Sequence, residues 1–178
     1  MRSAGLILGL AALLLATADM AVAQGPARPE AGLRAKLERM LDTTVTDWRF
    51  RLGENTGAEE PDFDDSSWES VKVGHQWMPH DSTCWYRTRI TIPERIHGQP
   101  VAGSTIRMLA GMDNEAKAYV DGRFVQQFMW AKGDFVIAEN AVPGQVVTIA
   151  LYGINRPGYG SLYQAYLACD ASTTQAES

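Results

Sequence analysis

Aromatic and planar polar side chains recur in the loop-rich stretches of this chain, in a combination that suits contact with sugars. Flat aromatic rings pack on the apolar face of a pyranose, and planar polar groups pair with its hydroxyls. The candidates for stacking are Trp77, Trp130 and Tyr159, with Trp85 and Tyr163 as further aromatic residues. The candidates for hydroxyl contact are His75, Asp81, Arg87, Asn155 and Arg156. Side chains of these types are the ones that contact with a sugar would use.

Packing in the core is the alternative role for each aromatic residue. We expect Trp48 and Trp68 to lie in the core, and Trp85 also fits a role in sheet packing. Trp77 and Trp130 lie in or beside polar loops, and Tyr159 lies in a glycine-rich turn. These last three are therefore the better candidates for stacking.

The acidic residues and histidines form no recognisable catalytic motif. Glycoside hydrolysis needs two carboxylates ~5–10 Å apart, whereas most acidic residues here lie in turns, where Asp usually caps the backbone. His75, His80 and His97 are the only histidines, and their spacing establishes neither a triad nor a metal site. The sequence therefore assigns no catalytic residue, metal or cofactor. Residues 62–65 do offer the clustered oxygens that a structural calcium ion would take.

The first residues of the chain have the three regions of a secretory signal. Arg2 supplies a positive charge, residues 5–16 are apolar and rich in leucine, and residues 21–23 (AVA) form a small-x-small cleavage site. We expect residues 1–23 to be a signal peptide that is cleaved after Ala23, so that the mature protein is secreted or periplasmic. A membrane anchor is the alternative, but the apolar run is shorter than the ~20 residues of a spanning helix.

Export changes the interpretation of the two cysteines. Cys84 begins the longest expected strand and Cys169 ends the last one. In an oxidising compartment, two such thiols are expected to form a disulfide that ties the final strand to the middle of the fold. Two separate buried thiols are the alternative.

Length and charge narrow the classes of partner. At 178 residues the chain fits one domain with a real core. Its net charge is −5 and its Lys and Arg residues form no basic run, which argues against nucleic acid or an anionic membrane as the partner of the mature chain.

Hydrophobic periodicity predicts one short helix followed by strands. Residues 24–32 are a leader of flexible composition, and the apolar residues of 32–41 recur at helical spacing. From residue 43 onward the period is two. The expected strands are 45–52, 71–73, 84–92, 104–110, 116–120, 124–130, 134–137, 146–154 and 162–168.

The strand at 84–92 shows the period of two most clearly. Tyr86 and Ile90 fall on one face, and Arg87 and Arg89 fall on the other. This alternation predicts one buried face and one wet face.

Asp121 and Gly122 give the strongest signal for a hairpin turn. Whether Phe124 or Val125 then lies beside Val120 is open.

About nine short strands and no alternation of strands with helices predict an all-β fold, an antiparallel sandwich or barrel. The expected organisation is a leader with a short helix at 24–42, a sandwich at 43–169 and a flexible tail at 170–178.

Four segments form an ordered set of motifs. They are WRF at 48–50 followed by Gly53, DDSSWESV at 64–71 followed by Trp77, WYR at 85–87 in a strand ending at Pro93, and the stretch from GMD at 111–113 through YVDG at 119–122 to Phe135. In this order they resemble the N-terminal sugar-binding domain of glycoside hydrolase family 2 enzymes, over roughly residues 47–167.

The resemblance implies a jelly-roll sandwich of the galactose-binding-like class that binds carbohydrate. The family's catalytic carboxylates lie in a separate (β/α)₈ barrel, so the resemblance carries over no catalytic residue. The family usually has Asn-Gly where this chain has Asp121-Gly122, and residues 128–135 lack its usual His and Gly-Gly pattern.

The function expected on these grounds is that of an exported, non-catalytic carbohydrate-binding module. One alternative is an accessory domain or fragment of a larger, β-galactosidase-like glycosidase, which would act with a partner chain or further domains. Another is a structural sandwich that binds protein.

Overall fold

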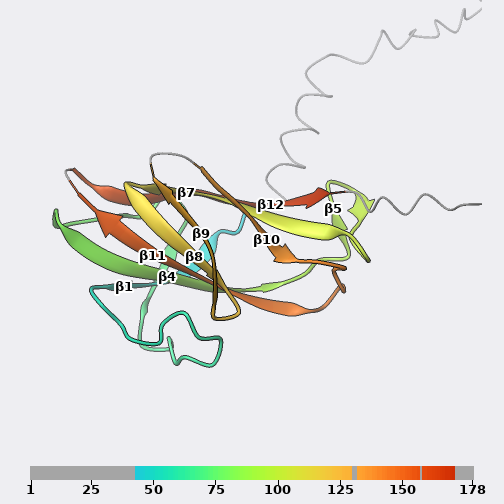
Figure 1. Cartoon of the computed structure of the whole chain (residues 1–178), viewed down its shortest axis with the longest axis horizontal. Helices are drawn as coiled ribbons and strands as arrows, with labels where there is room; N and C mark the ends of the chain where they lie inside the picture. Colours follow the sequence, from blue (N-terminus) through green and yellow to red (C-terminus); the bar gives the residue numbers. More distant parts are fainter. Residues whose placement is uncertain (1–42, 130–131, 157, 171–178) are drawn as a thin grey trace, which may run out of the picture.

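Two antiparallel sheets packed face to face form the part of the chain that the computed structural model describes, residues 43–129, 132–156 and 158–170 (Figure 1). The larger sheet has six strands in the order β2-β1-β4-β11-β8-β9, and the smaller has four in the order β10-β7-β12-β3. A separate ribbon pairs β5 with β6. The strands are β1 (Asp47–Leu52), β2 (Glu69–Lys72), β3 (Gln76–Trp77), β4 (Ser82–Thr91), β5 (Arg95–Ile96), β6 (Gln99–Pro100), β7 (Thr105–Asp113), β8 (Glu115–Val120), β9 (Arg123–Met129), β10 (Lys132–Ala138), β11 (Val146–Asn155) and β12 (Gly160–Asp170).

The strand pattern confirms the prediction of an all-β antiparallel sandwich. Each of the nine expected strands overlaps an observed one, and the strands that the prediction lacks are the two-residue β3, β5 and β6. The predicted signal peptide, leader and helix lie outside the described residues, as do residues 171–178. No helix forms within the described ranges, and hence none that is long and apolar enough to cross a membrane.

The main core lies between the two sheets. Tyr86 and Ile90 of β4 point into it, as the period of two predicts, and meet residues such as Met108 of β7 and Leu162 of β12. Burial of these side chains supplies most of the hydrophobic stabilisation of the sandwich.

The other face of β4 is covered, so the prediction of a wet outer face is wrong for the middle of this strand. Trp85 and Arg87 are buried there beneath the segment that joins β1 to β2, residues 53–68, which we call the covering loop. Ala58 and Trp68 of the loop join Trp85 in a second, smaller apolar cluster. Hydrophobic periodicity predicts which side chains share a face of a strand. It does not predict whether a loop distant in sequence covers that face.

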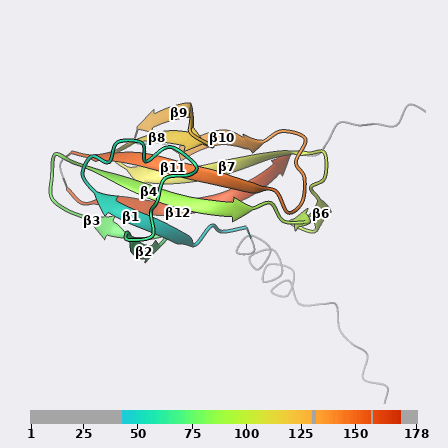
Figure 2. The ribbon, with the colours of Figure 1, turned by 90° about the horizontal axis from the view of Figure 1, so that it is seen from below.

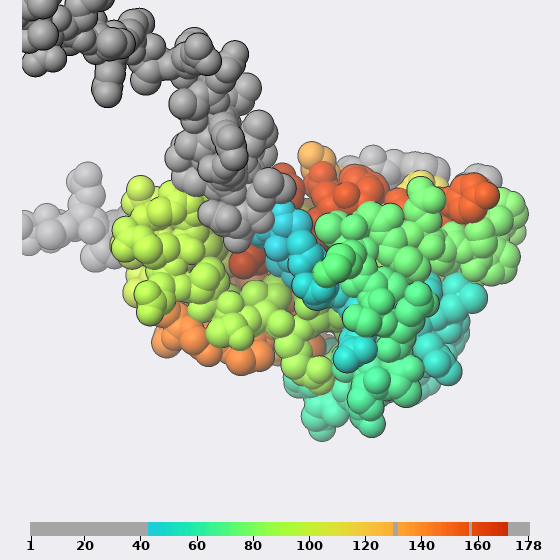
Figure 3. All heavy atoms as spheres, turned by 180° about the vertical axis from the view of Figure 1, so that it is seen from behind, coloured from blue at the N-terminus to red at the C-terminus, as the bar shows by residue number. Residues whose placement is uncertain are grey.

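Figures 1 and 2 show the covering loop on the side of the larger sheet that faces away from the smaller one. From behind, the N-terminal half of the described chain, blue to green, forms one continuous side of the molecule (Figure 3). The larger sheet is therefore sandwiched between the core on one side and a loop of its own chain on the other.

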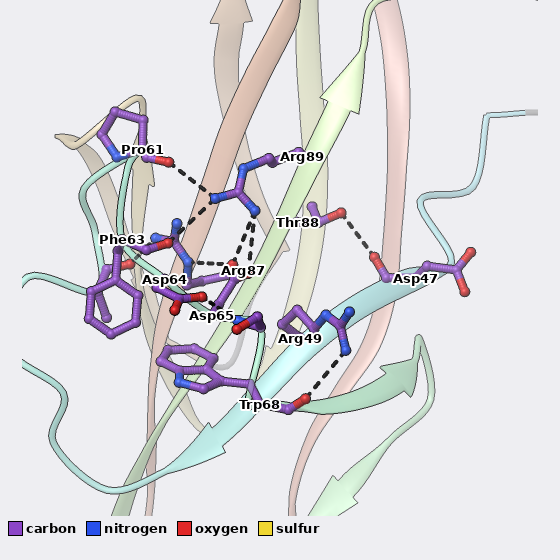
Figure 4. A network of polar contacts seen from close by, with 12 residues as sticks. Asp47, Arg49, Pro61, Phe63, Asp64, Asp65, Trp68, Arg87, Thr88 and Arg89 are labelled. Carbon is purple, nitrogen blue, oxygen red and sulfur yellow. Dashed lines mark hydrogen bonds and ion pairs between the residues drawn. The ribbon is translucent and has the colours of Figure 1, made fainter.

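A buried ion pair fastens the covering loop to β4 (Figure 4). The Nε atom of Arg87 donates to Asp65 Oδ2 at 2.9 Å, and its Nη1 donates to the carbonyl oxygen of Ala58. Arg89 approaches the other carboxylate oxygen of Asp65 at 3.3 Å. The Arg87 guanidinium carbon also lies 5.3 Å from the centre of the Phe63 ring. Every one of these partners of Arg87 belongs to the covering loop.

The turn between β8 and β9 has two residues, as the Asp-Gly signal predicts. Val120 pairs with Arg123, and both turn residues have positive φ, 46° at Asp121 and 79° at Gly122. Phe124 then pairs with Tyr119, and a bulge at residue 125 shifts the register so that Gln126 pairs with Ala118. The register that the sequence left open is therefore settled with Arg123, and neither Phe124 nor Val125, as the partner of Val120.

The predicted disulfide is not formed, and both cysteines are free. Cys84 belongs to the larger sheet, close to Gly153 and to Met112, which pairs with Leu162 of β12. Cys169 lies near the other end of β12. It is seven residues from Leu162, which corresponds to a distance on the order of 20 Å at ~3.3 Å per residue. A disulfide requires Cα atoms within ~7 Å, so the two thiols cannot join in this fold. Burial raises the pKa of the Cys84 thiol, which keeps it protonated.

We predict that Asp65→Ala lowers the free energy of unfolding by about 3–5 kcal/mol, because it leaves the Arg87 guanidinium buried without its counter-charge. Urea unfolding followed by tryptophan fluorescence measures the loss. Lys72→Ala is the matched control, since it breaks an ion pair with Asp47 that has the same type of carboxylate but is exposed to solvent. Equal losses in the two variants would show that the buried pair does not fasten the loop.

Candidate functional site

Three connecting segments meet at one end of the sandwich, which we call the loop end. They are residues 78–81 between β3 and β4, Asn114 between β7 and β8, and residues 156 and 158–159 between β11 and β12. Hydrogen bonds join all three segments to one another or to β11. Of the predicted sugar-contacting residues, four belong here: Asp81, Asn155, Arg156 and Tyr159.

Asn155 braces the loop end from beneath the surface. This last residue of β11 is buried, and its Nδ2 atom donates to the carbonyl oxygens of Pro79 at 3.0 Å and Gly158 at 3.2 Å. The Nδ1 atom of His80 lies 3.0 Å from both the backbone nitrogen and the carbonyl oxygen of Gly158. Asn155 and His80 thus hold two loops together, and the predicted contact of Asn155 with a sugar hydroxyl stays a prediction.

Trp77 lies in the core with 4% of its surface exposed, so the expectation of a surface ring available for stacking is wrong. Its indole packs flat on Gly160, where an added Cβ would lie 2.3 Å from Cε2. A Cβ at Gly153 would meet Met112 Cε at 2.6 Å and Cys84 Sγ at 2.9 Å before the indole, whose Cη2 lies at 3.3 Å. Close packing on Trp77 therefore explains Gly160, whereas Gly153 makes room chiefly for Met112 and Cys84.

Hydrogen bonds join Arg156 to Asn114 and to Glu115, the first residue of β8. The backbone N–H of Arg156 donates to Asn114 Oδ1 at 2.5 Å, and its guanidinium Nη2 donates to Glu115 Oε2 at 3.1 Å. The other oxygen of Glu115 accepts a hydrogen bond from Gln127 Nε2 at 2.5 Å. Glu115 is almost fully buried, whereas about half of the Arg156 side chain is exposed. The guanidinium is thus held in place and still faces solvent.

Three predicted contact residues are exposed at the loop end. Tyr159 has 62% of its surface accessible, and Asp81 and Arg156 are exposed as well. Asp81 has a φ of 52°, a left-handed conformation that Asp tolerates better than most residues. Together they present an aromatic ring, a cation and a carboxylate to solvent on a braced backbone.

His75 packs against aromatic residues and is not among the exposed residues of the loop end. Its Nδ1 lies 2.7 Å from the hydroxyl of Tyr86, and its ring centre lies 4.5 Å from that of Phe50. Burial lowers the pKa of His75 and raises the pKa of Tyr86, so both side chains favour their neutral forms. The predicted hydroxyl contact of His75 stays a prediction.

Arg87 is distant from the loop end. It lies five positions along β4 from Ser82, on the order of 16 Å at ~3.3 Å per residue, and its side chain is fully covered. Arg87 is therefore not exposed at the surface, and its predicted contact with a sugar stays a prediction. Trp130 lies outside the described residues.

The carboxylates of the predicted calcium turn already have partners from the chain. Asp64 Oδ1 accepts from the backbone N–H of Ser66 at 3.0 Å, and Asp65 pairs with Arg87. Within residues 43–129, 132–156 and 158–170, no group of three or more His, Cys, Asp or Glu residues could hold a metal ion. These carboxylates serve the turn and the covering loop.

No protein-family model and no curated protein matches this sequence. Solved structures do match. A calcium-binding mutant of β-glucuronidase 2 from Bacteroides uniformis is 25% identical over 71% of this chain and 17% of that chain, with a TM-score of 0.61. A glycosyl hydrolase family 2 member from Bacteroides cellulosilyticus is 20% identical over 71% of this chain and 20% of that one, with a TM-score of 0.60. A β-glucuronidase from Ruminococcus gnavus is 14% identical over 71% and 28%, with a TM-score of 0.55.

The described sandwich fits a domain of glycoside hydrolase family 2 enzymes, which confirms the resemblance seen in the sequence. The chain spans only 17–28% of the length of the three matched enzymes.

Proposed function

We propose that this chain, whose sandwich fits a glycoside hydrolase family 2 domain, is an exported, non-catalytic carbohydrate-binding module with a jelly-roll, galactose-binding-like fold. The observation that carries the proposal is the exposed group of Tyr159, Arg156 and Asp81 on the braced backbone of the loop end. Each side chain has the chemistry that recognises one part of a sugar.

Tyr159 supplies the ring for stacking. Large, rigid aromatic side chains offer contact area at a low cost in conformational entropy, and an exposed tyrosine leaves its ring face open to a pyranose. The preceding loop residue, Gly158, is held by His80, and the following residue, Gly160, is packed on Trp77. The backbone on both sides of Tyr159 is therefore fixed before a ligand arrives, which reduces the ordering cost of binding.

Arg156 and Asp81 supply polar contacts. The guanidinium of Arg156 keeps free donors after its bond to Glu115, and such a planar fork pairs well with a carboxylate or with neighbouring hydroxyls. The matched enzymes include β-glucuronidases, whose names point to a uronic acid. A β-glucuronide is therefore the first sugar to test, with a β-galactoside as a neutral comparison.

We predict that the chain binds methyl β-glucuronide with a Kd between micromolar and millimolar, and that Tyr159→Ala raises this Kd about tenfold, the equivalent of ~1.4 kcal/mol. Isothermal titration calorimetry measures both values, with methyl β-galactoside in parallel. Val142→Ala is the control, because Val142 is as exposed as Tyr159 but lies in the loop between β10 and β11, at the opposite end of β11. Absence of binding to either sugar, or equal Kd values for wild type and Tyr159→Ala, would contradict the proposal.

A second candidate is an accessory domain or fragment of a larger glycosidase, favoured by the small share of the matched enzymes that the chain covers. This candidate predicts that the coding sequence continues in frame past Ser178, or that the chain co-purifies with a glycosidase. Sequencing of the genomic DNA and purification from the source cells test both outcomes. Hydrolysis of p-nitrophenyl β-glucuronide by the purified chain alone would contradict both candidates.

Export is the remaining part of the proposal, supported by the ordered regions of residues 1–23. We predict that the chain recovered from outside the cytoplasm begins at Gln24, because cleavage follows Ala23. N-terminal sequencing of that fraction measures this, and replacement of Ala21 and Ala23 by larger residues should block processing. An uncleaved Met1 terminus on a chain retained in the cytoplasm would exclude export.

A further inference from the structure

The outer face of the larger sheet carries a row of side chains that continues away from the loop end. Tyr152 of β11, Lys117 of β8 and Gln127 of β9 are register partners on three neighbouring strands. Tyr119 and Phe124 are partners in the next row on β8 and β9. Since side chains two apart along a strand share a face, these five lie on the same side of the sheet.

The aromatic residues of this face, Tyr119, Phe124 and Tyr152, form what we call the aromatic platform. The ring centres of Tyr152 and Tyr119 lie 5.0 and 5.7 Å from that of Trp85, which is buried under the covering loop. Phe124 extends the series, 5.8 Å from Tyr119, and is 56% exposed. The platform is thus anchored on a buried tryptophan and open to solvent at its far side.

Polar groups are interleaved with the rings. The hydroxyl of Tyr152 donates to Glu54 Oε1, which also accepts from Thr83 Oγ1 at 2.9 Å. Burial and this hydrogen bond raise the pKa of Tyr152 to about 12, so its hydroxyl stays protonated. The ammonium of Lys117 lies 5.8 Å from the centre of the Tyr152 ring. Rings alternating with an ammonium, an amide and a carboxylate suit a ligand that is apolar on one face and rich in hydroxyls at its edges.

Glu115 connects the platform to the loop end. One of its carboxylate oxygens holds Gln127 beside the platform, and the other holds Arg156 at the loop end. From Arg156 to Tyr152 the strand covers four residues, on the order of 13 Å at ~3.3 Å per residue. This distance is longer than one monosaccharide.

We propose that the ligand is an oligosaccharide, with one sugar at the loop end and further sugars along the aromatic platform. This inference rests on the proposed function, because it extends the same site. A protein partner is the competing occupant of an exposed face. The alternation of rings with hydrogen-bonding groups matches the apolar face and the hydroxyl-rich edges of successive sugars, which is the reason for preferring a glycan.

The test compares chain lengths. Titration calorimetry measures the Kd for methyl β-glucuronide and for the disaccharide, tetrasaccharide and hexasaccharide of hyaluronan, which contain β-linked glucuronate. These values give the dependence of Kd on ligand length. Gluco-oligosaccharides derived from cellulose provide an uncharged series for comparison. We expect the Kd to fall by about three- to tenfold from the monosaccharide to the longest oligomer that binds. Phe124→Ala and Lys117→Ala should flatten this dependence and leave the monosaccharide Kd unchanged.

Tyr163→Ala is the matched control, since Tyr163 is an exposed tyrosine on β12 of the other sheet. Wild-type Kd values that do not vary with length, or a length dependence that survives Phe124→Ala and Lys117→Ala, would overturn the inference while leaving sugar binding at the loop end intact. Absence of binding to every compound would overturn the proposed function itself. A second protein molecule buried on Phe124, seen as self-association that Phe124→Ala abolishes, would replace the glycan as the occupant.

Discussion

The buried ion pair between Arg87 and Asp65 is the interaction on which the outer half of this structure depends. Removing a guanidinium from water costs several kcal/mol, which is offset only where a counter-charge and further acceptors lie close by. Here every such group comes from the covering loop: the Asp65 carboxylate, the Ala58 carbonyl and the Phe63 ring. The loop supplies the partners of Arg87 Nε and Nη1 from its place across the larger sheet, while the buried Nη2 atom has no hydrogen-bond partner among the described residues.

The position of the covering loop then determines what remains accessible. It buries Trp85, which in turn supports the rings of Tyr119 and Tyr152, and it brings Glu54 within hydrogen-bonding distance of the Tyr152 hydroxyl. The sheet face is consequently divided into a covered part over β4 and an open part over β8 and β9. A buried arginine thus determines, through the loop that it fastens, which part of the sheet face stays accessible.

Local pattern predicts the fold well and the site less well. The alternation at 84–92 gives the buried face of β4 correctly, because strand geometry dictates which side chains share a face. The accessibility of a side chain depends instead on contacts distant in sequence. Trp77 follows a polar stretch, yet the absence of a side chain at Gly160 leaves room for its indole in the core. Tyr159, beside the same glycine, is the ring left exposed, and no local signal distinguishes the two.

The polar residues of the loop end divide in the same way between buried groups that brace the backbone and groups that face solvent. At the loop end, Glu115 bonds to Gln127 and Arg156 with its two carboxylate oxygens, and the amide nitrogen of Asn155 donates to Pro79 and Gly158. The Oδ1 atom of Asn155 is buried and has no hydrogen-bond partner among the described residues. The bonds that are made hold the geometry of the loop end. The exposed residues keep their capacity for a ligand. Glu115 engages Arg156 and Gln127 with different oxygens of one carboxylate, so a single buried side chain links the loop end to the aromatic platform.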